Sequence, residues 1–543
     1  MAATGRGARS RAWRWATWAL LALLAVVMLA SVADYGISVD EGVQHRWGRR
    51  LLRWYVTLGN EPRVTEDLDQ TKYGGFFEIV AELAVRASPL ETYTTRHLAN
   101  VVFAFAAFVA VVRVGRRLGG PPGGFFSLLV LALTPVFYGN AFFNPKDVPF
   151  AAMYAVALAG ILACDDWPRT TWARALRAGA LIGLASGVRV GGVVLYGFAL
   201  VLWVAILAQA GPAGRPARPS RRELLHLGAR WTGAVAVGWG VMVAFWPWAM
   251  LDPLRNPFRA VGRFSQFWEG MIVFYDGRLL PAGQVSRFYL PNWFALTLPE
   301  SSLVAALLGV VALVLLLRRG PLAPEARLRL LQAGWLAGIP ALVVAGVVVK
   351  HMPLFDGLRH FLFLLPIFAV LAGAGVAAFL RAPLRRGTRR VGVALLAAAC
   401  LVTLVDMVRL HPYESVYFNR LWAGGMSTGV ARYEADYWCL SYKAGCEWLL
   451  RRFAGARCRE PIRVAGYSVH QQTEHYLQET EEGRRLFVTV PVEGGRPNYV
   501  LATTRFQDHL RAPGTKVFTV ERMGATLFYL FEAQAPECEP TAP

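Results

Sequence analysis

The sequence is poor in charged residues. Only 17% of its 543 residues are charged, whereas 55% are hydrophobic, and the mean hydropathy is +0.37. A soluble protein with this composition would be unusual. The shortage of charge therefore argues against a soluble globular protein and favours a polytopic membrane protein.

Several signals of familiar functions are also absent. There is no HExxH motif and no CxxC pair, so ligand spacing gives no support for a zinc site. There is no internal repeat, which argues against a transporter built from repeats. The first apolar run is too long for a removed signal peptide and lacks a small-residue cleavage site.

Long apolar runs are what the sequence has in abundance. Runs of roughly 18 residues are long enough to cross a bilayer as helices. By that criterion we expect about eleven spans, near 15–33, 97–115, 124–143, 148–164, 176–190, 192–210, 230–250, 301–317, 328–349, 360–380 and 391–408.

Basic residues set the expected orientation. They gather in residues 1–14 and in alternate connections, for example at Arg113, Arg116 and Arg117. The positive-inside rule places these segments in the cytoplasm. The domain 15–408 then spans the membrane, and the first outer loop 34–96 and the tail 409–543 lie outside the cytoplasm.

The net charge of +21 could suggest nucleic acid as a partner. Most of the excess lies in short loops on the predicted cytoplasmic side, where anionic membrane lipids account for it. We therefore expect membrane lipids and no nucleic acid as partners.

The outer tail is predicted to be a small α/β domain. A helix is expected near 440–453, and strands near 462–467, 486–491, 498–503 and 516–531. Four of the six cysteines lie in this tail, and four cysteines allow three pairings. Proximity favours Cys439–Cys446 with Cys458–Cys538, and free thiols are the alternative.

The first outer loop has two stretches of helical spacing. Gly42 to Thr57 reads as an amphipathic helix in the interface, and Phe76 to Val85 as a second helix. Glu78 and Glu82 lie one turn apart on the second helix. We expect both to face solvent rather than to bind a metal ion.

Two acidic motifs fall on the same predicted outer face. Asp40 and Glu41 follow the first span, and Asp147 ends the motif Asn144-Pro145-Lys146-Asp147 after the third. Asp147 is predicted to begin a helix, where the positive end of the dipole stabilises an anion. The sequence therefore predicts one active site, built from both loops, with Asp40, Glu41 and Asp147 as its acids.

A sugar linked to a polyprenyl phosphate suits a site at a membrane surface. Transfer to a hydroxyl needs a carboxylate that takes the proton and cations that hold the phosphate. A divalent metal ion, held by Asp40 and Asp147, is an optional addition. The candidate phosphate partners are Lys72, Lys146, Arg189, Lys350, His351, Arg359 and His360.

Each candidate has a simpler structural explanation. An Asp-Glu pair before a helix is most often a cap or a solvated turn. Lys350 and Arg359 can anchor helices at the interface by reaching to water. His351 and His360 are more often structural than ligating.

Together these motifs resemble the polytopic glycosyltransferases of the C superfamily. The match is to glycosyltransferase family 39, the dolichyl-phosphate-mannose protein mannosyltransferases and their bacterial relatives that transfer aminoarabinose to lipid A. It covers roughly residues 15–440. It implies a bundle of about eleven transmembrane helices with a small α/β extracytoplasmic domain, in the inner membrane of a bacterium.

The resemblance also implies roles for individual residues. Asp40 is the expected base, Asp147 lies against the acceptor or a metal ion, and Arg359-His360 contacts the lipid phosphate. The motifs 417–419 and 436–438 look like those of bacterial members. The sequence lacks the MIR-type repeats of the eukaryotic mannosyltransferases, so the resemblance leaves the acceptor open.

Three functions are compatible with this topology. The first is a transferase, of the inverting kind, that moves a sugar from a polyprenyl phosphate to a hydroxyl acceptor on a protein, lipid or glycan. The second is a flippase or transporter for a lipid-linked saccharide, and the third is a non-catalytic scaffold. The long outer loop and the surface position of the acids favour the enzyme.

Overall fold

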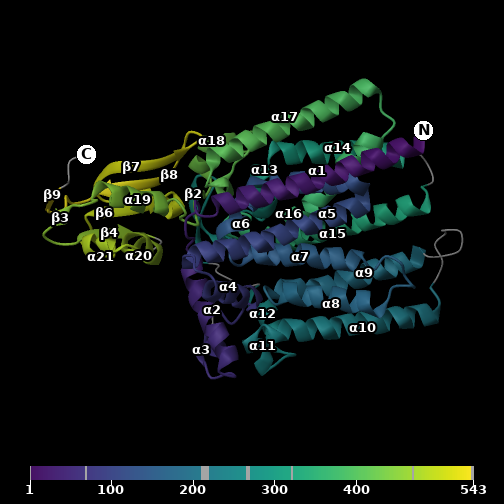
Figure 1. The fold of residues 1–543 in the computed structure, drawn as a ribbon, viewed down its shortest axis with the longest axis horizontal. Helices are drawn as coiled ribbons and strands as arrows, with labels where there is room; N and C mark the ends of the chain where they lie inside the picture. The colour runs from purple at the N-terminus through teal and green to yellow at the C-terminus, as the bar shows by residue number, and fades with distance from the viewer. Residues whose placement is uncertain are drawn as a thin grey trace.

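The computed structural model describes residues 2–67, 70–209, 219–264, 270–318, 322–467 and 470–539. Long helices run side by side in one bundle, and a smaller domain with a sheet caps one end of it (Figure 1). The bundle helices are α1 (Ala2–Ser31), α5 (Thr92–Ala132), α6 (Pro135–Phe143), α7 (Asp147–Leu162), α8 (Trp172–Ser186), α9 (Val194–Gln209), α10 (Arg221–Ala244), α14 (Glu300–Leu317), α15 (Pro324–Lys350), α16 (Leu364–Arg381) and α17 (Arg386–Leu410).

Each of the predicted apolar runs lies on these helices. Among the described residues, seven segments are long and apolar enough to cross a membrane, or up to eight if the bent α6–α7 pair is one span. The difference from eleven has structural reasons. Helix α5 contains two predicted runs, which reverse at Gly120 with a φ of 66°. Helix α8 has only 15 residues, and α10 is not among the seven segments.

Small residues let α8 and α10 approach closely. A Cβ added to Gly179 would lie 2.0 Å from the carbonyl oxygen of Ala234, and one added to Gly183 would lie 2.2 Å from that of Gly238. Two such positions four residues apart form the small-residue contact typical of membrane helices. This contact fixes the end of α8, which is followed by Arg189.

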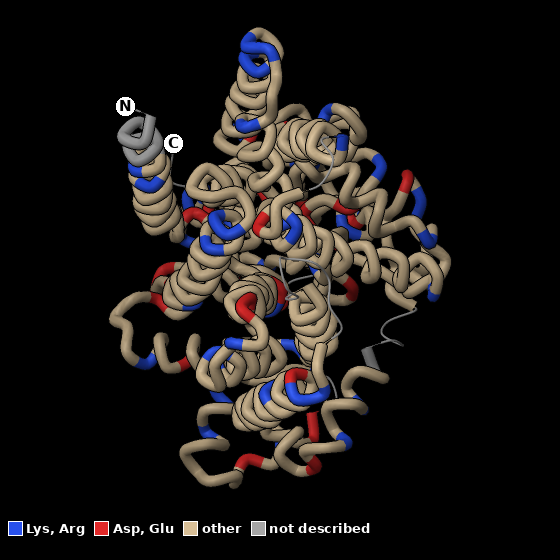
Figure 2. The backbone as a smooth tube through the Cα atoms, turned by 90° about the vertical axis from the view of Figure 1, so that its right-hand side faces the viewer, with Lys and Arg blue, Asp and Glu red and all other residues tan. Residues whose placement is uncertain are grey.

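The termini lie at opposite ends of the bundle (Figure 1). Figure 2 looks at the bundle from the end that carries the N-terminus and shows Lys and Arg at many of the nearer helix ends. The other end carries short elements: α2 (Glu41–Val56), α3 (Arg63–Glu66), α4 (Phe76–Ala87), α11 (Pro247–Leu251), α12 (Asn256–Phe264), α13 (Tyr289–Thr297) and a hairpin of β1 (Ile272–Tyr275) and β2 (Arg278–Pro281).

The C-terminal domain is α/β, as predicted. Its sheet has the order β5-β4-β6-β8-β7, parallel from β5 to β6 and antiparallel beyond. Helix α19 packs against β6, β7 and β8, and α20 against β4 and β5. The elements are α18 (Gly425–Arg432), α19 (Tyr442–Arg452), β3 (Arg457–Cys458), β4 (Ile462–Gly466), α20 (His470–Gln478), α21 (Glu481–Leu486), β5 (Phe487–Thr489), β6 (Tyr499–Thr503), β7 (Thr515–Arg522), β8 (Ala525–Glu532) and β9 (Cys538–Glu539).

One of the two favoured disulfides is present. Cys458 and Cys538 are bonded and join β3 to β9. The pairing of Cys439 with Cys446 is wrong, because both are free thiols buried in the core. Proximity in sequence misled here: Cys439 lies in the turn before α19, and Cys446 lies on the buried face of that helix.

Candidate active site

The site lies where the C-terminal domain meets the bundle, at the end opposite the N-terminus (Figure 1). Asp40 occupies the position before α2, but its side chain makes no capping hydrogen bond. Its Oδ2 atom instead lies 2.9 Å from Nζ of Lys146 and 3.7 Å from Nη1 of Arg359. The simple explanation of Asp40 as a helix cap therefore does not describe its contacts.

The Glu41 side chain points away from the cations and stabilises the turn before α2. Its Oε2 accepts a hydrogen bond from the backbone N–H of Ser38 at 2.7 Å, and its Oε1 lies 3.0 Å from Nε2 of His97. The Glu41 side chain is completely buried, whereas 23% of the Asp40 side chain is exposed. Of the two adjacent acids, Asp40 is the one that faces the cations.

The second acidic motif, Asn144-Pro145-Lys146-Asp147, lies at the sharp bend between α6 and α7. The Asn144 side chain accepts from the backbone N–H of Asp147 at 2.9 Å and donates to its Oδ2 at 3.1 Å. These bonds close the turn, and the two helix axes differ by 113°. Lys146 then reaches Asp40, while Asp147 at the start of α7 pairs with Arg189 at 2.5 Å.

Tyr73 connects the two pairs. Its ring centroid lies 5.2 Å from Nζ of Lys146 and 5.6 Å from the guanidinium carbon of Arg189. Both distances are within reach of a cation–π interaction. The neighbouring Lys72 is partly buried on the same loop. The segment 34–96 thus contributes both the acid and an aromatic support for the cations.

Arg359 is held from two sides. Asp356 contacts it at 2.9 Å, and its guanidinium carbon lies 4.8 Å from the ring centroid of Trp438. Asp356 in turn lies 3.4 Å from Nη2 of Arg505, which also donates to the carbonyl of Tyr437. A chain of opposite charges therefore runs from the C-terminal domain through Arg505, Asp356 and Arg359 to Asp40.

Sequence reasoning did not include Asp356 or Arg505 among the site residues. Asp356 is 2% exposed and Arg505 is 7% exposed, and isolated buried charges are costly. The position of Asp356 beside Arg359 was a local signal. Arg505 lies far from the other motifs in sequence, and no local pattern marks it.

The cations decide the ionisation of Asp40. Burial alone would raise the pKa of its carboxyl group, but Lys146 and Arg359 outweigh burial and bring that pKa well below its usual range. Asp40 is therefore ionised at neutral pH and, while it is paired in this way, a weak base.

The remaining predicted phosphate partners lie in different places. His360 is next to Arg359, whose Nε lies 3.3 Å from its ring nitrogen. Lys350 and His351 are both exposed at the end of α15, and the His351 ring contacts the carbonyl of Val285 at 2.8 Å. The structure thus gathers Lys146, Arg189, Arg359 and His360 and leaves Lys350 and His351 outside.

The expectation that Glu78 and Glu82 face solvent is wrong. Both are 3% exposed, because α4 packs between α2 and α5. Glu78 pairs with the fully buried Arg96 at 2.6 Å, and Glu82 lies 3.3 Å from His45 and 3.3 Å from Arg86. The predicted helix is present as α4, but protein side chains, rather than water, contact the two carboxylates.

The side chains do not fit the expected divalent metal ion. Among the residues that the structure describes, no group of three or more His, Cys, Asp or Glu side chains could hold one. The predicted ligands Asp40 and Asp147 each face a cation already, and Lys146, Arg189 and Arg359 would repel a metal ion placed between them.

Comparisons with known proteins identify the fold. No protein-family model and no curated protein matches the chain. Among solved structures, ArnT from Cupriavidus metallidurans, an aminoarabinose transferase bound to undecaprenyl phosphate, aligns with a TM-score of 0.51 and 16% identity. The alignment covers 94% of this chain and 97% of ArnT.

A second solved relative is the oligosaccharyltransferase AglB from Archaeoglobus fulgidus, in complex with an inhibitory peptide and a dolichol-phosphate. It aligns with a TM-score of 0.46 and 12% identity over 90% of this chain and 69% of AglB. This chain has the C-superfamily glycosyltransferase fold. At these identities the likeness concerns the fold, and the chemistry has to be argued from the site.

Proposed function

We propose that the protein transfers a sugar from a polyprenyl-phosphate donor to a hydroxyl acceptor on the extracytoplasmic face of a bacterial inner membrane. The observation that carries the proposal is the contact of the partly exposed Asp40 with Lys146 and Arg359 at the outer end of the bundle. The fold of ArnT, which was solved with undecaprenyl phosphate bound, supports this choice of donor.

In this proposal the cations bind the donor phosphate. The bond from the sugar carbon C1 to the phosphate oxygen breaks, and polyprenyl phosphate leaves with one more negative charge. Lys146 and Arg359 stabilise that charge, and Tyr73 and Trp438 keep the two cations in place. Arg189 remains with Asp147 at the start of α7 and holds the neighbouring loop.

Asp40 takes the proton of the acceptor hydroxyl while the hydroxyl oxygen bonds to C1. When the donor phosphate draws Lys146 and Arg359 away from Asp40, the carboxylate regains basicity, because those cations are what lower its pKa. The base is thus strengthened only when the donor is bound. Attack on the side of C1 opposite the phosphate inverts the configuration at that carbon.

The charge distribution supports the proposed orientation. Basic connections lie at the end of the bundle that carries the N-terminus, and the C-terminal domain with the site lies at the other (Figures 1 and 2). The positive-inside rule assigns the first end to the cytoplasm. A polyprenyl chain would then remain in the bilayer while its phosphate reaches Asp40 at the outer surface.

The test is transfer of radiolabelled sugar from a panel of polyprenyl-phosphate sugars in proteoliposomes. Asp40→Asn should reduce transfer about 10²- to 10⁴-fold, the usual contribution of a general base. Asp34→Asn is the matched control, because Asp34 lies on the same connection between α1 and α2 but pairs with His411. Label that crosses the bilayer on intact donor would indicate a flippase, and full activity of Asp40→Asn would refute the role of Asp40.

A chelator provides a second check. Because the cations already neutralise Asp40 and Asp147, we expect EDTA to leave the transfer rate unchanged. Loss of transfer in EDTA, with recovery on addition of a divalent metal ion, would contradict this part of the proposal.

A further inference from the structure

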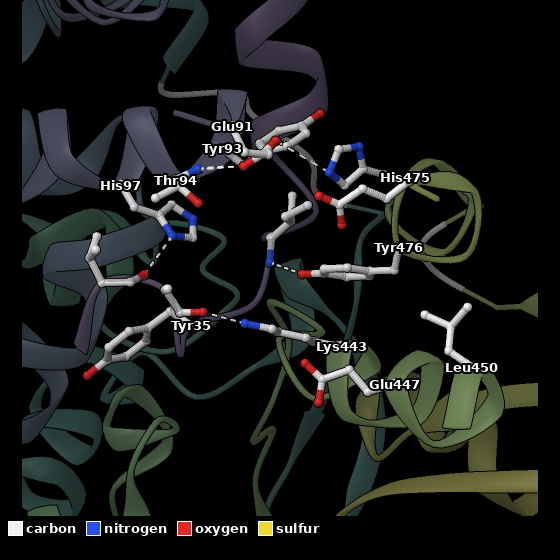
Figure 3. A pocket seen from close by; sticks show the side chains of 14 residues that line it. Tyr35, Glu91, Tyr93, Thr94, His97, Lys443, Glu447, Leu450, His475 and Tyr476 are labelled. Atoms are coloured by element: carbon white, nitrogen blue, oxygen red, sulfur yellow. Dashed lines mark hydrogen bonds and ion pairs between the residues drawn. The ribbon is translucent and has the colours of Figure 1, made fainter. Parts of the chain in front are cut away.

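A cavity lies beside the turn that carries Asp40, between the bundle and the C-terminal domain. It has a volume of about 190 Å³. One wall is formed by the segment 32–37 and the start of α5, and the other by α19 and α20 (Figure 3). The cavity therefore exists only because the C-terminal domain sits on the bundle.

The walls of this cavity combine hydrogen-bond donors and acceptors. Carboxylates of Glu91, Glu447 and Glu479 line it, together with Lys443 and the hydroxyl of Tyr476. A sugar hydroxyl both donates and accepts a hydrogen bond, so it is matched by such a mixed lining. Figure 3 shows Lys443 and Glu447 on the side of α19.

Aromatic rings form one side of the same cavity. The rings of Tyr93 and His475 meet edge to face, with centroids 4.9 Å apart, and His475 contacts Glu91 at 3.4 Å (Figure 3). The Glu91 side chain also accepts from the backbone N–H of Thr94 at 2.8 Å, which caps α5. These contacts fix the rings in place before any ligand arrives.

The lining does not suit a phosphate or another anion. Lys443 already donates to the carbonyl oxygens of Ala33 and Asp34. His475 faces Glu91, and the carboxylates of Glu447 and Glu479 would repel a negative charge. The cations that suit the donor phosphate lie in the other site, with Asp40.

The cavity is joined to the catalytic turn through short contacts. His97 lines it and pairs with Glu41, the neighbour of Asp40, at 3.0 Å. The Tyr476 hydroxyl accepts from the backbone N–H of Ile37 at 2.5 Å. A Cβ added to Gly42 would start 3.7 Å from the Tyr93 hydroxyl oxygen. A ligand here would touch Ile37 directly, and it would touch His97 and Tyr93, which lie next to Glu41 and Gly42.

We propose that this cavity binds a sugar unit of the acceptor, so that the acceptor is a saccharide without negative charge. The volume is below the roughly 300 Å³ of the smallest sites for drug-sized ligands, so the cavity is suited to a single sugar ring. This inference rests on the proposed function, and it assigns the acceptor class that the sequence left open.

The experiment measures transfer from the accepted donor to a panel of uncharged methyl glycosides of mannose, glucose, N-acetylglucosamine and arabinose. A Ser/Thr peptide and an anionic phosphosugar are tested beside them. Release of sugar to water is recorded in every reaction, because it reports donor cleavage without an acceptor site. We expect at least one methyl glycoside to accept label, and the peptide and phosphosugar to accept little.

Two variants connect the result to the cavity. Glu447→Gln removes a carboxylate that lines it and should raise the acceptor KM about tenfold, with the donor KM and release to water unchanged. Leu450→Trp should block the cavity and abolish transfer to the glycoside while release to water persists. Glu474→Gln, on the exposed side of α20, is the matched control and should behave as the native protein.

The outcomes separate the two proposals. No release of sugar from any donor, even to water, would refute the transferase itself. Donor cleavage with transfer only to the peptide or the phosphosugar would overturn the saccharide site, as would an unchanged acceptor KM in both cavity variants.

Discussion

Two clusters of charge lie at the end of the bundle that carries the C-terminal domain, and they differ in access to solvent. In the first, the side chains of Asp40, Lys146 and Arg359 are 23%, 12% and 10% exposed. In the second, the Glu78 and Arg96 side chains are 4% and 1% exposed. The first cluster, which we call the open cluster, can exchange a partner for a ligand.

We call the second cluster, Glu78 and Arg96, the closed cluster. Its members cannot exchange each other for a ligand, because both side chains are buried. A buried pair of this kind adds little net stability, but loss of one partner leaves an uncompensated charge. Ion pairs of similar composition therefore have different roles, one in ligand exchange and the other in stability. Variants of the open cluster should lose activity and keep the fold, and variants of the closed cluster should lose stability.

The largest expected effect is on stability. Glu78→Ala leaves the Arg96 guanidinium buried without its partner, which should cost about 3–5 kcal/mol of free energy of unfolding. Thermal unfolding in detergent measures it. Glu325→Ala is the control, because its partner Arg329 is exposed and such pairs contribute about 0–1 kcal/mol. Equal losses of stability in the two variants would contradict the claim that buried and exposed ion pairs differ.

Lys146→Met should act on the open cluster alone. Loss of one positively charged group that stabilises the leaving phosphate should reduce transfer about 10²- to 10³-fold, with little change in the unfolding temperature. Lys350→Met is the control, because Lys350 is exposed at the end of α15 and should change transfer less than about twofold. A larger loss in Lys350→Met than in Lys146→Met would show that the phosphate binds elsewhere.

Arg505→Met tests the connection to the C-terminal domain. Without Arg505, Asp356 is less well held, and Arg359 loses its orientation toward Asp40. We expect kcat to fall about tenfold while the acceptor KM stays unchanged. Arg511→Met, whose side chain is 62% exposed, is the control. Unchanged kcat in Arg505→Met would show that Arg505 does not position the site.

The closed cluster should also make stability depend on pH. Burial raises the pKa of Glu78 to about 7, although Arg96 lowers it. The folded protein then keeps a proton that the unfolded chain releases, so the free energy of unfolding should fall as pH rises through 7. Unfolding temperatures at pH 5 and pH 8 measure this slope, and Glu78→Gln should make it shallower. An unchanged slope would refute the assignment to Glu78.

Much of the fold was readable from the sequence because its signals are local. The apolar runs and the strands of the C-terminal domain each follow from their own composition. The start of a helix at Asp147 was also predicted, and α7 begins at that residue. These features depend on neighbours in sequence.

The site was only partly readable, because it depends on neighbours in space. Glu78 was predicted to face solvent, but it is buried and pairs with Arg96, which lies 18 residues further along the chain. His351 was predicted to contact the phosphate, but it ends α15 with a left-handed backbone, at a φ of 46°, and lies outside the site. Neither the partner of Glu78 nor the position of Arg505 follows from spacing along the chain.

The most direct test of the account is the affinity of the protein for undecaprenyl phosphate. If Asp40 and the phosphate share Lys146 and Arg359, removal of the competing carboxylate in Asp40→Asn should tighten binding about tenfold, and Lys146→Met should weaken it. Tighter binding by a variant that no longer transfers sugar would support competition between Asp40 and the phosphate for Lys146 and Arg359. Weaker or unchanged binding in Asp40→Asn would contradict it.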